Sequence, residues 1–172
     1  FENHFLATKN LIHFLNRKQL KSFIHLGSSD EYGDNISPIS EIQRESPISP
    51  YSFAKVATSH MLQMLHRTEK FPAVILRLFL VYGPTQDEER FLPNLIINSL
   101  RNNDIPLTFG EQLRDFCYVN DVVNAIFLSF DKESALGNII NIASGDPIKI
   151  KDMVIRVNSF IQKGKPLFGS IK

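Results

Sequence analysis

The sequence has little cysteine and no strong excess of either charge. Its single cysteine, Cys117, excludes an intramolecular disulfide and a zinc site built from cysteines. The 19 Lys and Arg residues against 18 Asp and Glu residues leave a formal net charge of +1, and the basic residues are scattered along the chain. This charge pattern gives no basis for predicting a nucleic-acid partner.

Long apolar runs are also missing. No run approaches the roughly 20 residues of a membrane-spanning helix, and no basic segment followed by an apolar leader is visible. The five histidines form no metal-like cluster, so we expect no metal site. With 172 residues, of which 43% are hydrophobic and 22% charged, we expect a cytoplasmic protein that folds around a core and has no membrane partner.

Helix and strand patterns alternate along the chain. The helical spacing of apolar residues predicts a first helix over residues 1–15. Short apolar runs predict strands at 22–27, 73–81, 107–109, 116–119 and 139–142, and amphipathic runs predict helices at 51–69, 92–100, 121–130 and 153–161. The alternation indicates an α/β fold around a parallel sheet. The run over 73–81 is almost wholly apolar, as in a strand that is covered on both faces.

The helix over 51–69 follows an irregular loop over 34–50 that is rich in proline and serine. Ser49 is the expected N-cap and Pro50 the expected first helical residue. The apolar contacts of this helix are expected to be Phe53, Val56, Met61, Leu62 and Leu65. Farther along, Asn120 is expected to cap the next-to-last helix, and Cys117 is expected in the core.

Tyr51 and Lys55 are four residues apart, so their side chains share one helix face about one turn apart. An ammonium group near a phenol favours the phenolate, and such a tyrosine can act as a general base or acid. The pair alone is common by chance and usually marks only a helix surface. From the spacing alone, catalysis and a plain surface both stay open.

Ser28 and Asp30 directly follow the strand at 22–27. Ligands bind at the carboxyl ends of strands in α/β sheets, so Ser28 is expected to lie beside the Tyr51 hydroxyl. A turn of serine and aspartate that ends at Gly33 explains the same residues equally well.

Five segments, in this order, resemble the extended short-chain dehydrogenase/reductases, the NAD-dependent epimerase/dehydratase family that acts on nucleotide sugars. They are SFIHLGSSDEYG at 22–33, SPYSFAK at 49–55, LRLFLVYGP at 76–84, RDFCYVNDV at 114–122 and GNIINIASG at 137–145. The resemblance implies the C-terminal part of a Rossmann-like doubly wound parallel sheet with a small α/β substrate-binding layer. Residues 1–84 would hold the C-terminal part of the NAD(P)-binding domain with its catalytic residues. Residues 85–172 would be mainly substrate-binding, with Rossmann strand and helix segments interleaved.

The resemblance also implies a catalytic set. Tyr51 would transfer protons, and Lys55 would hold the nicotinamide ribose and favour the phenolate. Ser28 would hydrogen-bond the sugar hydroxyl that is oxidised, and Asp30 would be a further acid or base. Both Tyr51 and Lys55 would contact the cofactor, which is NAD or NADP, and Val81 would line its site.

Arg114 matches the family arginine that binds the nucleotide diphosphate, and Arg90 and Phe91 resemble residues that contact the phosphates and the nucleotide. A guanidinium group makes bidentate bonds to phosphate. A surface salt bridge to an acidic neighbour is the alternative for Arg114. The candidates are Glu111, Asp115 and Asp121.

The implied function is NAD(P)-dependent modification of a nucleotide sugar by hydride transfer, with Tyr51 as the acid/base. The reaction is 4-epimerisation, 4,6-dehydration or keto-sugar reduction, and the full-length protein is expected to be a homodimer. A non-catalytic relative that serves as a binding or regulatory domain is the alternative, and the joint retention of Ser28, Tyr51 and Lys55 argues against it. A serine hydrolase is disfavoured because Ser28 lies in no Gly-x-Ser-x-Gly elbow.

The sequence departs from the family pattern in three places. The glycine-rich turn that cradles the cofactor phosphates does not occur, and we expect it before Phe1 in a longer protein, with the chain alone inactive. Leu80 stands where many relatives have an asparagine that contacts the substrate. Ser29 stands where many dehydratases have aspartate, so the three reactions stay open.

Overall fold

The computed structural model describes residues 1–171. The chain forms two compact units, each built from two separate segments. The first unit consists of Phe1–Phe79 and Asn120–Ala143, and the second consists of Leu80–Val119 and the segment from Ser144 onward. Among the described residues, no helix is both long and apolar enough to cross a membrane.

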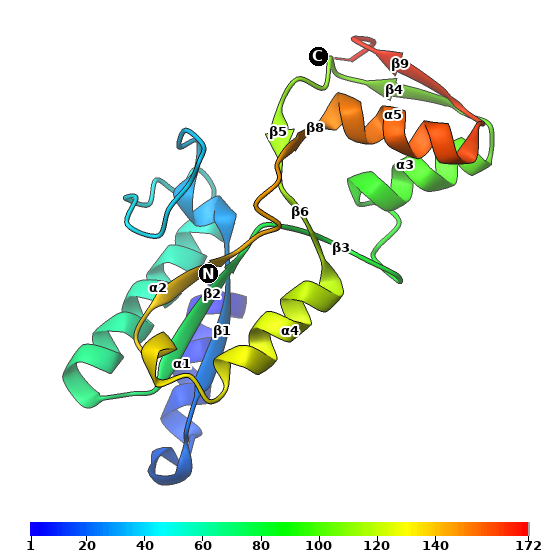
Figure 1. Cartoon of the computed structure of the whole chain (residues 1–172). Helices are drawn as coiled ribbons and strands as arrows, with labels where there is room; N and C mark the ends of the chain where they lie inside the picture. The colour runs from blue at the N-terminus through cyan, green and yellow to red at the C-terminus, as the bar shows by residue number, and fades with distance from the viewer. Residues whose placement is uncertain (172) are drawn as a thin grey trace. The chain divides into compact units, whose positions relative to one another are not determined.

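The first unit is an α/β structure around a parallel sheet (Figure 1). Its elements are the π-helix η1 (Glu2–Leu6), α1 (Ala7–Phe14), η2 (Arg17–Gln19), β1 (Phe23–Ser28), η3 (Ser29–Tyr32), α2 (Pro50–Glu69), β2 (Ala73–Leu78), α4 (Val119–Ser129), η4 (Glu133–Ala135) and β7 (Ile139–Ile142). The strand order is β1-β2-β7, and both pairs are parallel. The expected α/β class is therefore confirmed.

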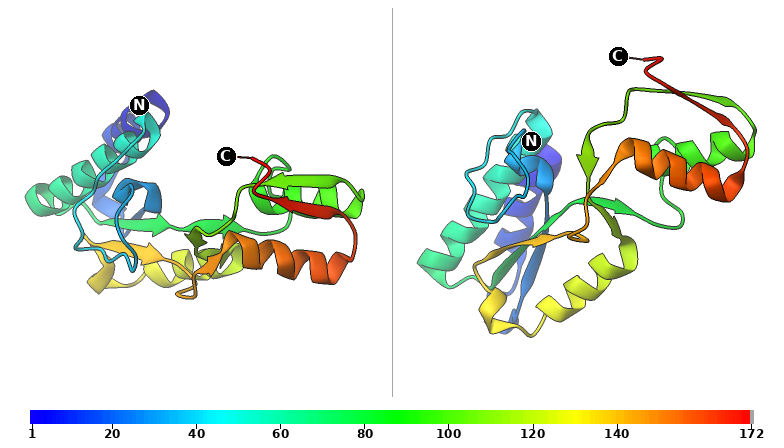
Figure 2. Two further views of the ribbon diagram at one scale, coloured as in Figure 1. Left: turned by 90° about the horizontal axis from the view of Figure 1, so that it is seen from above. Right: turned by 45° about the horizontal axis from the view of Figure 1, so that its top comes forward.

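Strand β2 has apolar side chains on both faces, as the run at 73–81 predicted. Ala73 and Ile75 pack against Leu62 and Leu65 of α2 and against α1. On the opposite face, Val74 and Leu76 pack with residues of α4 and of the segment before β7. Helices α1 and α2 thus cover one face of the sheet and α4 covers the other (Figure 2).

Helix α2 begins as predicted. The Ser49 side chain accepts a hydrogen bond from Ser52 N at 3.0 Å, and Pro50 is the first helical residue. The expected packing of Phe53 is wrong, because its side chain is 56% exposed. The face of α2 that lies on the sheet is formed mostly by small residues and two leucines, and it leaves Phe53 on the outer side. The buried residues are Ser52, Ala54, Thr58, Ser59, Leu62 and Leu65.

Up to residue 171, the second unit contains two helices and three short strand pairs. Its elements are β3 (Leu80–Tyr82), α3 (Phe91–Leu100), β4 (Asp104–Leu107), β5 (Leu113–Arg114), β6 (Phe116–Tyr118), β8 (Ile148–Lys149), α5 (Ile150–Ile161) and β9 (Lys165–Phe168). Strand β3 pairs with β6 and β4 with β9, both in parallel, whereas β5 and β8 are antiparallel. Its core packs side chains of α3, α5, β4 and β6 together, namely Leu95, Ile105, Phe116, Ile150 and Val154.

Three expected element boundaries are wrong. The strand expected over 73–81 breaks at Phe79, whose amide still bonds to Ile142 O, and the next amide, Leu80 N, bonds to Asp115 O in the second unit. The strand expected over 107–109 ends at Leu107. Helix α4 begins at Val119, which places Asn120 inside the first turn rather than at the cap. Hydropathy shows that a segment is buried but not which strand it pairs with.

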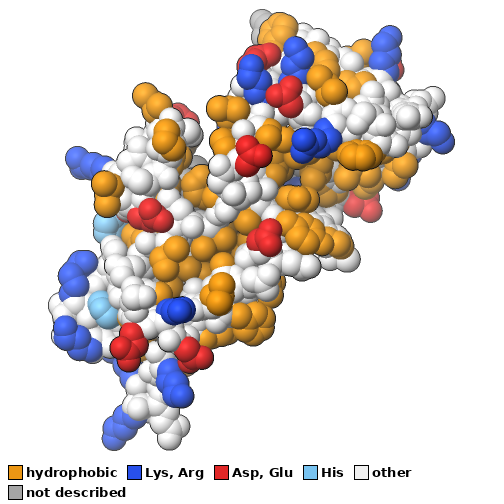
Figure 3. All heavy atoms as spheres, viewed as in Figure 1, with side chains coloured by type: hydrophobic (Ala, Val, Ile, Leu, Met, Phe, Trp, Pro, Cys, Tyr) orange, Lys and Arg blue, Asp and Glu red, His pale blue; other side chains and the backbone are white. Residues whose placement is uncertain are grey.

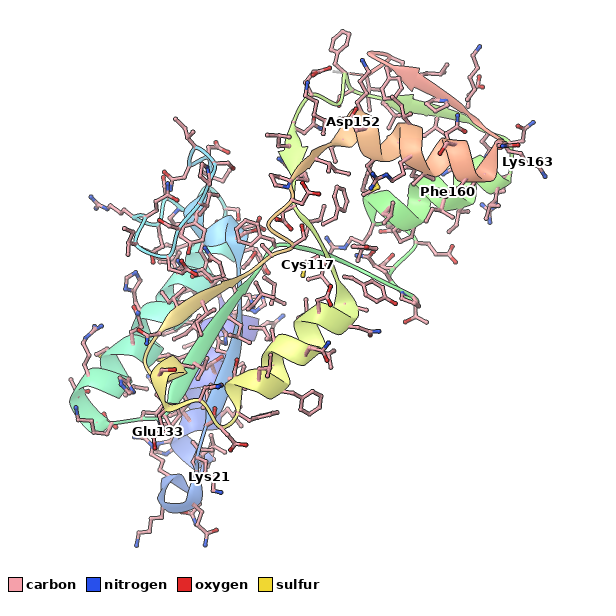
Figure 4. The ribbon with its side chains drawn as sticks, in the orientation of Figure 1. Lys21, Cys117, Glu133, Asp152, Phe160 and Lys163 are labelled. Carbon is pink, nitrogen blue, oxygen red and sulfur yellow. The ribbon has the colours of Figure 1, made fainter. Side chains whose placement is uncertain are left out.

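Cys117 lies on β6 (Figure 4) and is buried, which confirms its expected place in the core. On the face that Figure 3 shows, Lys and Arg side chains are scattered among acidic ones rather than gathered in a stripe. This agrees with the even charge pattern of the sequence.

Candidate active site

Ser28 is the last residue of β1 and the N-cap of η3. Its hydroxyl oxygen accepts a hydrogen bond from Asp30 N at 3.2 Å, and its own amide donates to Glu31 Oε1 at 3.0 Å. This reciprocal pattern is a capping box, in which each of the two side chains satisfies a free backbone amide. The sequence after the strand therefore fixes a sharp turn that keeps Ser28 half-buried at the end of the sheet.

The same turn presents Asp30 to solvent. Asp30 is exposed, and its carbonyl accepts a hydrogen bond from Gly33 N at 3.1 Å. Gly33 has a φ of +61°, and a Cβ there would collide with the carbonyl oxygen of Ser46. Only glycine fits this position. The segment is thus the expected turn of serine and aspartate, and it follows a parallel strand at its carboxyl end.

Lys55 reaches from the second turn of α2 to the end of β1. Its Nζ donates a hydrogen bond to Leu26 O at 2.8 Å. Burial lowers the pKa of Lys55, and the negative charge of Glu31 partly opposes that effect. The ammonium group is thus held close to the strand that ends at Ser28, in a partly desolvated position.

Tyr51 lies one turn before Lys55 and is 44% exposed. The Lys55 Nζ atom is 5.8 Å from the centre of the Tyr51 ring, so the two side chains share one face as predicted. Within residues 1–171, the Tyr51 hydroxyl forms no hydrogen bond, and none joins it to Ser28. The expected contact between Ser28 and the Tyr51 hydroxyl is therefore not formed in the described residues.

Two histidines near this pair were not singled out from the sequence. The His4 ring, on the π-helix η1, meets the Tyr51 ring edge-on at 5.2 Å. His25 lies on β1, and burial, together with the positive charges of Lys55 and His4, lowers its pKa to about 4. Neither histidine belongs to a metal-like cluster in the sequence. The sequence signal for His25 is its position on the strand, three residues before Ser28.

Glu31 and Arg77 were missed as well. Both side chains are fully buried and form an ion pair of 2.8 Å behind the Ser28 turn. Arg77 lies in the middle of the apolar run at 73–81, and the hydropathy of that run alone predicts an ordinary core strand. An arginine inside such a run is itself a signal, because a charge in a covered strand requires a buried partner.

The remaining expected site residues lie in the second unit. Val81 lies on β3 opposite Cys117, and its carbonyl accepts a hydrogen bond from Gln86 Nε2 at 2.9 Å. Arg90 precedes α3 and is exposed. Phe91 is half-buried and packs near Phe116, with ring centres 6.4 Å apart, so much of its ring belongs to the core.

Arg114 is exposed on β5, and its Nη1 donates to the neighbouring carbonyl of Leu113 at 2.8 Å. The acidic residues nearest to it in sequence have other partners. Glu111 pairs with Lys149 at 2.7 Å, and the Asp115 carboxylate accepts from Ser144 N and Gly145 N. None of the ion pairs within residues 1–171 includes Arg114, so the salt-bridge alternative is wrong.

In the part of the chain that the structure describes, no group of three or more His, Cys, Asp or Glu side chains is arranged to hold a metal ion. The polar groups at or near the end of β1 are the Ser28 hydroxyl, the Asp30 carboxylate and the Lys55 ammonium, and the Tyr51 ring lies beside Lys55. Groups of these kinds can donate, accept or transfer protons.

Comparison with known proteins identifies the family. Residues 1–143 match the NAD dependent epimerase/dehydratase family. The chain belongs to this family. The match covers most of the chain, and it confirms the resemblance that the five segments indicated.

Solved members of the family share the fold. The chain is 29% identical to a UDP-N-acetylglucosamine 4-epimerase of Methanobrevibacter ruminantium, with a TM-score of 0.88 over 99% of this chain and 58% of that one. It is 28% identical to a UDP-glucuronic acid 4-epimerase of Bacillus cereus, solved with UDP-glucuronic acid and NAD, with a TM-score of 0.87 over 95% of this chain and 53% of that one. The Rossmann-like α/β architecture is thereby confirmed.

Among curated proteins, the chain is 28% identical to a dTDP-D-glucose 4,6-dehydratase of Dictyostelium discoideum, over 91% of this chain and 39% of that protein. The chain spans about half the length, or less, of the curated relatives that it matches. Its relatives are thus NAD-dependent family enzymes that act on nucleotide sugars by more than one reaction.

Proposed function

We propose that the protein containing this chain modifies a nucleotide sugar with the help of NAD or NADP. One observation carries the proposal: Tyr51 and Lys55 share one face of α2, and Lys55 is bonded to β1 two residues before Ser28. Membership of the epimerase/dehydratase family supports it.

In this proposal, Tyr51 is the acid/base. Its exposed phenol takes the proton from a sugar hydroxyl and returns it in the reverse step, while the Lys55 ammonium stabilises the negative charge on the phenolate. Ser28 hydrogen-bonds the same sugar oxygen and holds it in line with Tyr51. A nicotinamide cofactor, when bound, would supply the hydride chemistry at the sugar carbon.

The residues at the end of β1 fit the nicotinamide ribose. An ammonium group has three N–H donors, and Lys55 uses one of them on Leu26 O. Two donors remain for ribose hydroxyls, and Tyr51 offers a further hydroxyl beside them. We assign Lys55, Tyr51 and Val81 to the cofactor side, and residues 1–84 to the C-terminal part of the cofactor-binding domain.

Arg114 and Arg90 are the proposed phosphate ligands. Arg114 is exposed and has no acidic partner within residues 1–171, so its guanidinium is available for the two phosphates of a nucleotide sugar. Arg90 is exposed just before α3, whose N-terminal end carries partial positive charge. With Phe91 beside it, we assign residues 85–172 mainly to substrate binding.

Asp30 bears on the choice of reaction. Its exposed carboxylate, two residues after Ser28, is a second acid or base of the kind that elimination of water requires. Relatives of the chain include a 4,6-dehydratase and 4-epimerases. We propose oxidation of a sugar hydroxyl as the first step, which epimerisation and dehydration share. Keto-sugar reduction would run the same hydride and proton transfers in the opposite direction, on a keto sugar as the substrate.

The direct test is an activity assay on the full-length gene product. Purified protein is incubated with NAD+ or NADP+ and with UDP-glucose, UDP-glucuronic acid or dTDP-glucose, and the products are separated by ion-pair chromatography. We expect one of these to be converted by the wild type and to stay unchanged with Tyr51→Phe. No conversion, together with no binding of any of the three nucleotide sugars, would favour a non-catalytic relative.

A further inference from the structure

A fully buried carboxylate lies directly behind the Ser28 turn. Glu31 is 0% exposed, and its Oε1 atom accepts the hydrogen bond from Ser28 N. Its Oε2 atom accepts from Ser59 Oγ at 2.8 Å and from Arg77 Nε at 2.9 Å, and it also lies 2.8 Å from Arg77 Nη2. One side chain thus joins the end of β1 to α2 and to β2.

Arg77 is the group that holds this carboxylate. It is also 0% exposed, and its guanidinium lies over the Tyr32 ring with Cζ 4.4 Å from the ring centre. Its Nη2 donates to Glu45 Oε1 at 2.7 Å. Burial lowers the pKa of Arg77, but the hydrogen bond to Glu45 and the charge of Glu31 outweigh this effect and raise it. Arg77 therefore stays charged.

The backbone at the end of β1 is shaped to admit the carboxylate. A Cβ on Gly27 would lie 2.6 Å from Glu31 Oε1 and 3.1 Å from Arg77 Cγ. Both distances are shorter than ordinary contacts between such atoms, so only glycine lets the Glu31 side chain reach the amide of Ser28.

Stability alone does not account for this arrangement. A buried ion pair contributes little net stability, because the loss of hydration offsets most of the attraction between the charges. Apolar residues of similar volume would fill the same space at least as well. What the pair adds is a directional hydrogen bond, because the Glu31 carboxylate accepts from the Ser28 amide and so fixes the position of that amide.

We propose that Glu31 and Arg77 are positioning residues for the active site. Arg77 holds the Glu31 carboxylate in place, and Glu31 holds the Ser28 backbone, so that the Ser28 hydroxyl is presented in one orientation. The proposal rests on the proposed function for the catalytic role of Ser28. Neither Glu31 nor Arg77 contacts the sugar in this proposal; both act through the turn.

The first test needs no activity. Hydrogen–deuterium exchange is measured on the full-length protein in peptides that cover residues 27–33. Glu31→Ala removes the acceptor of the Ser28 amide, and we expect exchange in this segment to rise on the order of tenfold. Leu62→Ala, on the same buried face of α2 but one turn beyond Ser59 and packed in the core against β2, is the matched control, because it lowers Tm and removes no contact of the turn. Unchanged exchange in Glu31→Ala, or an equal rise in Leu62→Ala, would overturn the proposal.

The second test separates positioning from folding by kinetics. For Glu31→Gln, we expect kcat to fall on the order of 100-fold, since small displacements of catalytic groups have effects of that size, with KM and cofactor affinity within about twofold of wild type. Glu45→Gln weakens the hydrogen bond that Arg77 donates to residue 45, but it leaves the bond from Ser28 N to Glu31 in place. It should therefore lower kcat far less than Glu31→Gln does. A wild-type kcat in Glu31→Gln contradicts the proposal.

A double variant guards against loss of fold. Glu31→Leu combined with Arg77→Met removes both buried charges together with the acceptor of the Ser28 amide, so neither charge is left buried without its partner. We expect it to regain Tm but to keep the low kcat, and recovery of kcat would show that the pair acts only on stability. If the wild type converts no nucleotide sugar, the proposed function fails, whereas the exchange experiment still decides whether Glu31 orders the turn.

Discussion

The Lys55 ammonium group is bonded to the main-chain carbonyl of Leu26, at 2.8 Å, rather than to an acidic side chain. A carbonyl fixes the position of the ammonium without neutralising its charge. This hydrogen bond links α2 to the backbone of β1. It thereby helps to position Tyr51, which lies one helical turn before Lys55. An acidic partner would have held Lys55 equally well but would have weakened its pull on a phenolate.

Tyr51→Phe removes only the phenolic oxygen from this arrangement. If Tyr51 is the acid/base, kcat of the full-length protein falls about 10²- to 10⁴-fold, the usual contribution of such a group. Cofactor binding, followed by the change in protein fluorescence or by calorimetry, stays nearly intact, because the Lys55 donors remain. Wild-type turnover in the variant would contradict the role of Tyr51.

Arg114→Ala tests the proposed phosphate contact. Loss of a charged hydrogen bond of about 1.5–3 kcal/mol raises KM for the nucleotide sugar by on the order of 10- to 100-fold, and NAD(P) affinity stays the same. Arg101→Ala, which changes another exposed arginine of the second unit, is the control. A defect confined to cofactor binding would mean that Arg114 belongs to the other ligand.

His25 makes stability depend on pH. Its pKa is about 4 in the fold and about 6.5 in the unfolded chain, so the unfolded state binds the proton more readily. The stability is complete above pH 6.5 and is lost as the pH falls toward 4. Between pH 7 and pH 5 this contribution falls by up to about 2 kcal/mol, and it should vanish in His25→Phe.

The measurement is urea unfolding of the wild type and the variant at both pH values. The acid-sensitive contribution of Glu45, whose pKa is lowered by its contacts with Arg77 despite the opposing effect of burial, is common to both proteins and cancels. His13→Phe, at an exposed position on α1, should keep the wild-type slope. Equal slopes for wild type and His25→Phe would show that His25 is not the group that titrates.

Gly27→Ala should displace the Glu31 carboxylate, because the new methyl group would lie too close to Oε1. Crowding of this kind costs about 1–3 kcal/mol of unfolding free energy, and kcat should fall with it. Gly145→Ala offers a useful contrast, since a Cβ there meets nothing within 4 Å and the cost comes only from its φ of +80°. Equal kcat in both variants, measured at saturating substrate, would speak against a role for Gly27 in placing Ser28.

Phe53→Glu tests the expected homodimer. Large apolar side chains on α1 and α2 are exposed in the described structure, and burial of such side chains is one way in which a dimer interface is stabilised. They include Leu11, Phe14, Phe53 and Met64. We expect the full-length wild type to sediment as a dimer and Phe53→Glu as a monomer with the same circular dichroism. A monomeric wild type would refute the expectation.

The sequence predicted best where the determinants are local. Ser49 and Pro50 specify the start of α2 by themselves, and the spacing from Tyr51 to Lys55 then places both side chains on one face. Ser28 was located because a short apolar run ends there. These predictions needed only neighbours within a few residues.

What the sequence did not reveal depends on distant partners. Arg77 and Glu31 are 46 residues apart. An arginine inside an apolar run indicates that a buried partner exists, but nothing local identifies that partner as Glu31. The break at Phe79 depends on a hydrogen bond from Leu80 N to Asp115 O, and Phe53 is exposed because α2 packs through smaller residues. Periodicity describes a face but does not say which neighbour will cover it.

The interleaved course of the chain has a consequence for how the protein is made. Strand β2 pairs with β7 in the register Ile75↔Ile139. The elements from β3 to α4 lie between these two strands in the chain, so the sheet is complete only after all of them have been made. During synthesis the first unit therefore stays incomplete until residues up to Ile142 have left the ribosome. Up to that point the apolar faces of β2 are only partly covered. The incomplete sheet therefore exposes apolar surface that is buried once β7 has paired.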